Sequence, residues 1–232
     1  MRLADHLLVA PILLPLLAGA AMLLIDERRR ELKAAINLAA IAALVGLALA
    51  LMEAANGTAD WAASLVYRLG DWPAPFAIVL VADRLSATML LLTAVLALAT
   101  TIYALPRWQN AGAHFHSMVQ FLLMGLNGAF LTGDLFNLFV FFELLLAASY
   151  GLMLHGSGRA RIRAGLHYVV VNLAASLFFL VGVALIYAVT GTLNMADLAA
   201  RVPHVAAENR MLLEAGAAIL GVAFLVKAGI WP

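Results

Sequence analysis

The sequence predicts an all-α, polytopic membrane helix bundle with about seven transmembrane helices. Of its 232 residues, 65% are hydrophobic and only 12% are charged, and the mean hydropathy is +1.00. Soluble domains are about half apolar and a quarter charged, so this composition excludes them. The apolar residues also gather into stretches of about 20 residues, which is the length that crosses a bilayer as a helix.

Hydropathy divides the chain into seven helices joined mostly by short polar connections. We treat them as a single transmembrane domain that covers residues 1–232. In chain order the predicted helices are Leu7–Ile25, Ala34–Glu53, Ile78–Leu105, His116–Leu131, Leu135–Leu154, Gly165–Val189 and Met211–Ile230.

Two connections are longer than the others. The first, Ala54–Ala77, carries the turn-forming residues Asn56, Gly57, Pro73 and Pro75. It also carries three aromatic residues suited to a membrane interface, which are Trp61, Tyr67 and Trp72. The second, Asn194–Asn209, contains a short amphipathic piece from Asp197 to Arg201, which we expect to lie on the membrane surface.

The basic residues predict an orientation. Eight of them follow the first, third and fifth predicted helices, and five lie on the opposite side. Because positive charge accumulates in cytoplasmic loops, the N-terminus is expected outside the cytoplasm. The larger group is Arg28, Arg29, Arg30, Lys33, Arg107, Arg159, Arg161 and Arg163, and the smaller is Arg2, Arg68, Arg84, Arg201 and Arg210.

Glu143 is an acid in the middle of an apolar helix, with roughly nine apolar or neutral residues, about 13 Å, on either side. At that depth it cannot reach water, and a bare charge costs about 2.5–3.5 kcal/mol. One interpretation is a protonated carboxyl that bonds to a neighbouring helix. The interpretation we favour is a carboxylate that pairs with a cation and controls how readily the cation loses its proton.

Lys227 is a base some 15 residues past the polar start of the last predicted helix. It could stretch its side chain to the membrane surface. However, Gly229 and Pro232 follow it and predict a broken helix, and broken helices at mid-depth line ion sites in transporters. A lysine out of water there releases its proton more easily, so we expect a proton carrier.

The sixth predicted helix carries a polar stripe. Tyr168, Asn172 and Ser176 recur every fourth residue, and His167 lies at the same end. Hydrogen bonds between helices would explain the stripe, and the alternative is a hydrated lining that passes protons to Lys227. Gln120 and Asn127 on the fourth predicted helix lie near Gly125 and Gly128, for which close helix packing is an equal explanation.

Other kinds of site are excluded or weakly supported. The chain has no cysteine, which removes disulfides and thiolate metal sites. We interpret His114 and His116 as solvated loop residues rather than metal ligands. There is no phosphate-binding loop, no hydrolase triad spacing and, at a net charge of +1, no sign of nucleic-acid binding. We predict neither a metal nor a cofactor.

The last residues lack the polar flank that normally follows a transmembrane helix, because Lys227 is followed only by Ala-Gly-Ile-Trp-Pro. We therefore expect that the sequence is the N-terminal part of a longer protein, cut inside its seventh helix.

One run of residues resembles a known family. The segment TGDLFNLFVFFE at 132–143, followed by Ser149 and Tyr150, is similar to the D subunit of Mrp-type (Pha, Mnh) multisubunit cation/proton antiporters. These are related to the proton-pumping membrane subunits of respiratory complex I. The similarity continues through residues 171–199 and the closing FLVKAGIWP.

The resemblance implies about fourteen helices, with two inverted five-helix repeats that each hold a broken helix and a half-channel. It places Glu143 at the family's helix-five glutamate and Lys227 at the lysine of broken helix seven. The expected protein is then a secondary transporter subunit of a bacterial inner-membrane complex rather than an enzyme. It would exchange Na⁺ or another monovalent cation for protons, beside other antiporter subunits.

The alternative is a membrane subunit of a redox complex, such as a complex I-like NADH:quinone oxidoreductase or a membrane-bound hydrogenase. Such a subunit would pump protons with energy from electron transfer elsewhere, through the same membrane chemistry. A passive scaffold is the third possibility, and it predicts that Glu143 and Lys227 can be neutralised without loss of transport.

Overall fold

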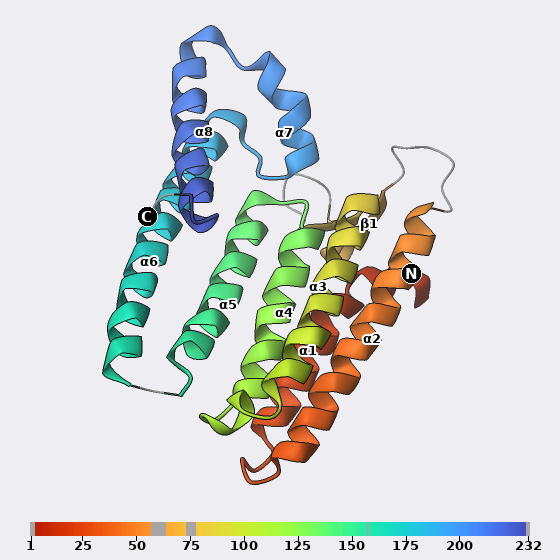
Figure 1. Cartoon of the computed structure of the whole chain (residues 1–232). Helices are drawn as coiled ribbons and strands as arrows, with labels where there is room; N and C mark the ends of the chain where they lie inside the picture. The colour runs from red at the N-terminus through yellow and green to blue at the C-terminus, as the bar shows by residue number, and fades with distance from the viewer. Residues whose placement is uncertain (1–2, 57–63, 73–77, 157, 231–232) are drawn as a thin grey trace.

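The computed structural model describes residues 3–56, 64–72, 78–156 and 158–230. These residues form long helices that run side by side, with a small antiparallel hairpin at one end (Figure 1). In chain order the α-helices are α1 Ala10–Leu23, α2 Arg30–Asn56, α3 Arg84–Ala104, α4 Phe115–Leu131, α5 Leu135–Leu154, α6 Arg159–Thr190, α7 Met195–Arg201 and α8 Ala207–Lys227. The 3₁₀ turns are η1 Leu3–Leu8, η2 Leu69–Asp71, η3 Trp108–Asn110 and η4 Val202–His204, and the strands are β1 Leu65–Arg68 and β2 Val79–Ala82.

The described helices confirm a polytopic membrane bundle. Five of them, α2, α3, α5, α6 and α8, are long and apolar enough to cross a membrane, and α1 and α4 are shorter apolar helices. These seven correspond to the seven helices that hydropathy predicts. The predicted surface piece at Asp197–Arg201 forms the end of α7, which Arg201 and Asp197 stabilise by an ion pair one turn apart.

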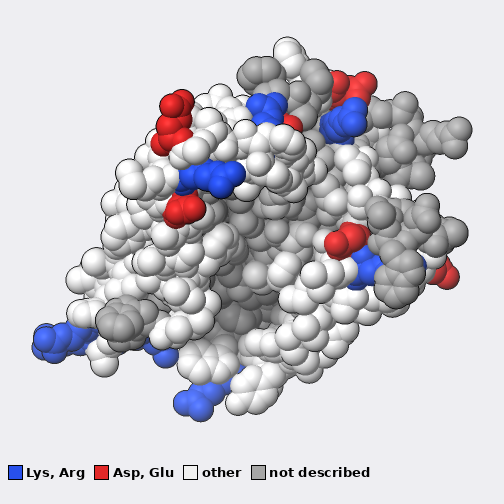
Figure 2. Space-filling view, turned by 90° about the horizontal axis from the view of Figure 1, so that it is seen from above, with Lys and Arg blue, Asp and Glu red and all other residues white. Residues whose placement is uncertain are grey.

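The surface agrees with this assignment. Figure 2 looks onto the end of the bundle seen from above, and it shows Lys, Arg, Asp and Glu only in small groups separated by broad uncharged areas. Many large apolar side chains on α3 and α6 are exposed, among them Leu85, Leu96, Leu166 and Leu177. In a bilayer such side chains face lipid, where they need no further cover.

Two predicted helices begin later than expected. Residues 79–82 form β2, so the helix predicted from Ile78 starts only at Arg84. β2 pairs with β1, where Val79 lies opposite Arg68, and the Asp83 carboxylate then caps α3 by accepting a bond from the backbone N–H of Ser86 at 2.7 Å. The helix predicted from Leu7 likewise starts at Ala10, because η1 occupies residues 3–8.

Part of the longest connection takes a defined place in the fold. Tyr67, predicted as an interfacial aromatic residue, lies in β1 with its hydroxyl 3.4 Å from Nδ1 of His6. Trp72 follows η2 and is 64% exposed. Gly57, Trp61, Pro73 and Pro75 lie outside the described residues.

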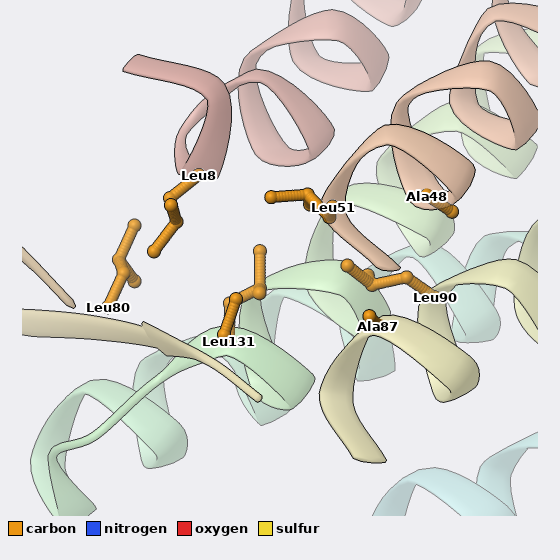
Figure 3. Close-up of a cluster of buried hydrophobic side chains, with 8 residues drawn as sticks. Leu8, Ala48, Leu51, Leu80, Ala87, Leu90 and Leu131 are labelled. Atoms are coloured by element: carbon orange, nitrogen blue, oxygen red, sulfur yellow. The ribbon is translucent and has the colours of Figure 1, made fainter. Parts of the chain in front are cut away.

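A cluster of buried apolar side chains joins the hairpin to the bundle. Leu8 of η1, Leu51 of α2, Leu80 of β2 and Leu131 of α4 point toward one another and are at most 4% exposed (Figure 3). Their burial removes apolar surface from water at this end, where the chain emerges from lipid. The hairpin is thereby fixed to the ends of α2 and α4.

Glycines bring α4 and α5 into close contact. A Cβ atom at Gly125 would lie 2.6 Å from Cβ of Leu145 and 2.7 Å from its backbone nitrogen. Gly128 meets Phe141 in the same way, and Gly151 of α5 meets Met118 of α4. Small residues let two membrane helices approach backbone to backbone. The predicted close packing at Gly125 and Gly128 is therefore present, and we call this contact the α4–α5 seam.

Asn127, on another face of α4, makes a hydrogen bond to α1. Its Nδ2 atom donates a hydrogen bond of 2.8 Å to the backbone oxygen of Pro11 in α1. In a regular helix that oxygen would accept the N–H of residue 15, but residue 15 is a proline and has none. Asn127 thus supplies from α4 the donor that α1 lacks.

The interpretation of His114 and His116 as solvated loop residues is wrong for His116. Its ring lies at the start of α4, only 3% exposed, where its Nδ1 accepts a bond from Asn37 at 3.0 Å and its Nε2–H donates to Gln109 at 3.1 Å. Asn37 in turn accepts a bond of 2.7 Å from Gln120. Gln120 therefore belongs to a buried hydrogen-bonded group between α2 and α4.

His114 adopts a left-handed backbone conformation with φ of +61°. It contacts Glu27 in the connection between α1 and α2. Its Nδ1 lies 2.9 Å from Oε1 of Glu27, and its backbone N–H donates to Oε2 of the same carboxylate. Lys33, which is 2% exposed, forms an ion pair with Glu27. This Glu27–Lys33–His114 cluster ties the connection between α1 and α2 to the connection between α3 and α4.

Candidate functional site

Glu143 lies near the middle of α5, a helix whose bounds match the prediction of Leu135–Leu154. The sequence sets this start, because Asp134 caps the helix by accepting the backbone N–H of Asn137 at 2.9 Å. An apolar run follows, with Glu143 as its only charged residue. The carboxyl group therefore lies about as far from one end of α5 as from the other.

Lys227 is the last residue of α8, and the helix ends beside it in a Schellman motif. Gly229 takes φ of +70°, its N–H bonds to the carbonyl of Val226, and the N–H of Ile230 bonds to that of Leu225 at 3.1 Å. α8 thus ends just before Gly229, one of the two positions at which a break is predicted, whereas Trp231 and Pro232 lie outside the described residues. Figure 1 shows this end of α8 about halfway along the bundle.

Glu143, Ser176 and Lys227 meet between α5, α6 and α8. The Lys227 Nζ atom lies 3.8 Å from Oε1 of Glu143 and donates a hydrogen bond of 3.1 Å to the Ser176 hydroxyl. That hydroxyl donates to the same Oε1 of Glu143. Ser176 therefore links the ammonium to the carboxylate, accepting from one and donating to the other.

The surroundings of this triad are largely apolar. The Lys227 side chain is 10% exposed and that of Glu143 is 34% exposed. Nζ of Lys227 also lies 5.5 Å from the ring centre of Phe142, a distance at which the face of an aromatic ring attracts a cation. The rings of Phe179 and Phe224 pack against Phe142, and Phe139 packs against Phe179. In such surroundings two opposite charges attract more strongly than in water.

A cavity of about 480 Å³ is lined in part by Lys227 and Phe142. His167, Tyr168 and Asn172 line it, so the structure gathers four of the residues that the sequence singles out. Leu126, Val171 and other apolar side chains complete the wall. The cavity is large enough for several water molecules and carries polar groups that could bind them.

The predicted stripe on α6 is divided in its contacts. The Tyr168 hydroxyl lies 3.3 Å from Oγ of Ser149 on α5, and Asn172 donates to the backbone oxygen of Tyr168 at 2.9 Å. Only Ser176 contacts Glu143 and Lys227 directly. His167 is exposed at the mouth of the cavity.

The site brings together an acid, a hydroxyl group and a base. In the described ranges no group of three or more His, Asp or Glu residues is placed to hold a metal ion. Sequence reasoning did not single out Phe142, the aromatic neighbour of the ammonium, although it is adjacent to Glu143 in the chain. An aromatic residue in an apolar helix does not by itself indicate a cation contact in the sequence, because most such rings pack against other apolar groups.

Comparisons with known proteins show which proteins this chain resembles. Residues 132–232 match the family described as NADH:quinone oxidoreductase/Mrp antiporter, TM. The chain is 62% identical over 229 residues to the D subunit of a probable K(+)/H(+) antiporter of Rhizobium meliloti, covering 98% of this chain and 42% of that protein. It is 40% identical over 231 residues to the D subunit of the Na(+)/H(+) antiporter of Alkalihalophilus pseudofirmus, covering 98% and 45%.

A solved structure shares the fold. A chain of the Mrp complex from Dietzia sp. superposes with a TM-score of 0.86 at 33% identity, covering 98% of this chain and 41% of that one. The sequence thus spans less than half the length of the relatives it matches. Along nearly all of its length the chain is similar to D subunits of K(+)/H(+) and Na(+)/H(+) antiporters and to a chain of an Mrp complex, and its residues 132–232 match the NADH:quinone oxidoreductase/Mrp antiporter model.

Proposed function

We propose that this chain is part of a subunit of a multisubunit monovalent cation/proton antiporter in a bacterial inner membrane. In this proposal Glu143 and Lys227 hold and release the transported proton. The observation that carries it is the contact among Glu143, Ser176 and Lys227 at mid-bundle depth, with 3.8 Å between the charged atoms. The relatives named as K⁺/H⁺ and Na⁺/H⁺ antiporter subunits supply the reaction class.

The triad would work by changing the distance between its charges. While Glu143 lies beside Lys227, each charge favours the charged form of the other. When the carboxylate moves away, the ammonium is left in apolar surroundings and releases its proton. The Ser176 hydroxyl can pass a proton, because it accepts a hydrogen bond from one partner while donating to the other.

The 480 Å³ cavity would be the route by which protons reach Lys227. Its polar lining residues, His167, Tyr168 and Asn172, would hold water in a file along α6. Segments beyond this chain and partner subunits would supply the second half of the proton route and the path of the cation. We propose that these partner subunits surround the chain in a hetero-oligomeric complex.

We also propose an orientation and a domain arrangement. The excess of arginines near the ends of α1, α3 and α5 supports a cytoplasmic position for those ends and an N-terminus outside the cytoplasm. Residues 1–232 would act as one transmembrane domain. Cysteines introduced singly into the loops and labelled from either side of the membrane would test the orientation.

The decisive experiment neutralises the two charges in the full-length protein within its complex. Glu143→Gln should retain assembly and abolish cation/proton exchange, whereas Glu143→Asp should keep part of it. Lys227→Ala should be inactive, and Lys227→Arg should be poor, because arginine stays protonated and cannot release a proton. Exchange is measured in membrane vesicles as the collapse of an imposed pH gradient by Na⁺ or K⁺.

A matched control is Glu214→Gln, which neutralises an exposed glutamate on α8. It should leave exchange unchanged. Normal exchange by Glu143→Gln at normal expression would overturn the ion-pair role, and full exchange by Lys227→Arg would make Lys227 an electrostatic anchor instead of a carrier.

The second candidate is a proton-pumping subunit of a redox complex, and the family match, which includes NADH:quinone oxidoreductases, favours it as the alternative. In that case proton movement would require electron transfer in a partner. Purification of the full-length protein with its partners distinguishes the two candidate functions. Iron–sulfur or flavin absorption spectra would support the redox complex. Cation-driven proton exchange by a complex that lacks these spectra would support the antiporter.

A further inference from the structure

Two cavities at the arginine-rich end of the bundle share a wall. The first, of about 740 Å³, lies where α5 ends and α6 begins, and Arg159 and Arg161 line it. The second, of about 460 Å³, lies between α3, α4 and α5. Trp108 and Leu152 line both. The two cavities therefore adjoin each other, and one is lined by basic groups while the other is mainly apolar.

We propose that this site binds one anionic phospholipid, with its phosphate at Arg159 and Arg161 and an acyl chain in the groove between α3, α4 and α5. The chemistry of the two cavities matches the two parts of such a lipid. Neither Glu143 nor Lys227 lines the site, so the proposal does not depend on the proposed function.

The basic end is held in place by neighbouring groups. Arg161 donates from Nη1 to the backbone oxygen of His155, and its guanidinium lies 5.4 Å from the ring centre of Trp108. His155 in turn donates from Nε2 to the backbone oxygen of Trp108 at 2.8 Å. A guanidinium has five N–H groups, and the carbonyl engages one of its nitrogens, so others can bind phosphate oxygens.

The apolar end is a groove along the helices. On α3 it runs from Thr93 to Thr101, about 12 Å along the axis, and on α4 it extends to Leu126. Side chains such as Leu96, Val119 and Leu122 line it. An α-helix with its side chains is about 10–12 Å wide, whereas an acyl chain is a single file of methylenes, which suits a groove of this volume.

The position of the site favours a lipid over a partner protein. Arg159, Arg161 and Arg163 follow one another on one turn and a half of α6, directly after the apolar α5. Basic pockets between transmembrane helices on the cytoplasmic side are typical binding sites for anionic headgroups. A phospholipid supplies a phosphate and an apolar chain joined at the same depth, and the bilayer delivers it at high concentration.

The experiment compares matched pairs of variants of the full-length protein in its complex, reconstituted with phosphatidylglycerol and phosphatidylcholine. Arg159→Gln removes a charge that lines the site, and Arg163→Gln removes one that does not. Ala97→Phe fills the groove, and Ala99→Phe adds the same ring to α3 outside it. Bound phosphatidylglycerol is counted by native mass spectrometry after removal of loosely held lipid.

We expect the wild type, Arg163→Gln and Ala99→Phe to retain phosphatidylglycerol over phosphatidylcholine. Arg159→Gln and Ala97→Phe should each lower its retention by about tenfold, the effect of losing one charge-assisted hydrogen bond or the space for the chain. Excess inorganic phosphate should leave the lipid bound. Equal retention by all five proteins, loss of the lipid to free phosphate, or a partner subunit that stays in the groove would overturn the proposal.

Discussion

Lys227 is closer to Ser176 than to Glu143. The ammonium nitrogen lies 3.1 Å from the serine hydroxyl and 3.8 Å from the glutamate carboxylate. The serine is therefore the direct partner of the lysine, and the carboxylate acts on it partly through that hydroxyl. A hydroxyl in this place fixes the distance between the two charges and completes their hydrogen bonding.

Removal of this hydroxyl should slow transport without preventing assembly. Ser176→Ala leaves the ion pair but deletes both bonds of the bridge, so we expect exchange in vesicles to fall by about tenfold, the equivalent of one charge-assisted hydrogen bond. Ser176→Thr, which keeps a hydroxyl, should recover part of the rate. Ser86→Ala on α3 is the control. Unchanged exchange by Ser176→Ala would show that the bridge has no part in transport.

The α4–α5 seam should tolerate no added methyl group. At Gly125 a Cβ would lie 2.6 Å from Cβ of Leu145, so Gly125→Ala forces the helices apart and should lower stability by about 1–3 kcal/mol. At Gly46 of α2 a Cβ meets nothing within 4 Å, so Gly46→Ala should raise stability by about 0.5–1 kcal/mol. Thermal unfolding in detergent measures the change in stability of each variant. A change of the same sign for Gly125→Ala and Gly46→Ala would refute the packing argument.

Asn127 and Pro15 should be coupled. Asn127→Leu removes the donor to the Pro11 oxygen and should cost about 1–3 kcal/mol, because that oxygen is then buried without a partner. Pro15→Ala restores a backbone N–H within reach of the same oxygen. The double variant should accordingly be more stable than Asn127→Leu alone. Additive effects of the two substitutions in unfolding experiments would contradict the coupling.

The Glu27–Lys33–His114 cluster should make stability depend on pH. Burial raises the pKa of Glu27, but the hydrogen bonds from Lys33 and from the backbone N–H of His114, with the charges of both side chains, outweigh it and hold this pKa below its ordinary value of 4.5. A lowered carboxyl pKa contributes stability that is present above the ordinary value and is lost as pH falls through the folded value.

The wild type should therefore lose stability as pH falls below about 4.5, and Glu27→Gln should lack this part of the dependence. At neutral pH Glu27→Gln should be destabilised, since it leaves Lys33 buried without its partner, and Glu27→Gln with Lys33→Met should recover. Glu31→Gln, an exposed neighbour on α2, is the control. The same pH profile in the wild type and Glu27→Gln would rule out this role of the cluster.

The sequence predicts most helices well because each is a long apolar run between polar residues. α5 has the predicted bounds, since Asp134 marks its start and the apolar run marks its length. α6 begins at Arg159, six residues before the predicted start, because arginines are good helix formers that a hydropathy profile places outside the membrane. β2 was missed because a four-residue apolar strand beside a helix has the same hydropathy as the helix.

The candidate site likewise contains residues that the sequence indicates and contacts that it does not. Glu143 and Lys227 stand out because charge is rare inside apolar helices, but they lie 84 residues apart and no spacing rule brings them together. Ser176 is indicated by its helical spacing, while Asn172 on the same stripe turns its amide to its own backbone. His116 and Asn37 pair across two helices, and neither carries a local signal of its partner.

The α4–α5 seam also determines which helix Glu143 is packed with. Gly125, Gly128 and Gly151 bring α4 and α5 close together at three levels, where an added Cβ would clash. Glu143 thus belongs to a closely packed two-helix frame. Ser176 and Lys227 belong to α6 and α8, which pack on each other through Gly182 and Gly216 as a second frame. If Glu143 and Lys227 separate during transport, as we propose, the separation would require side-chain rotation or a displacement of α6 and α8 relative to α4 and α5.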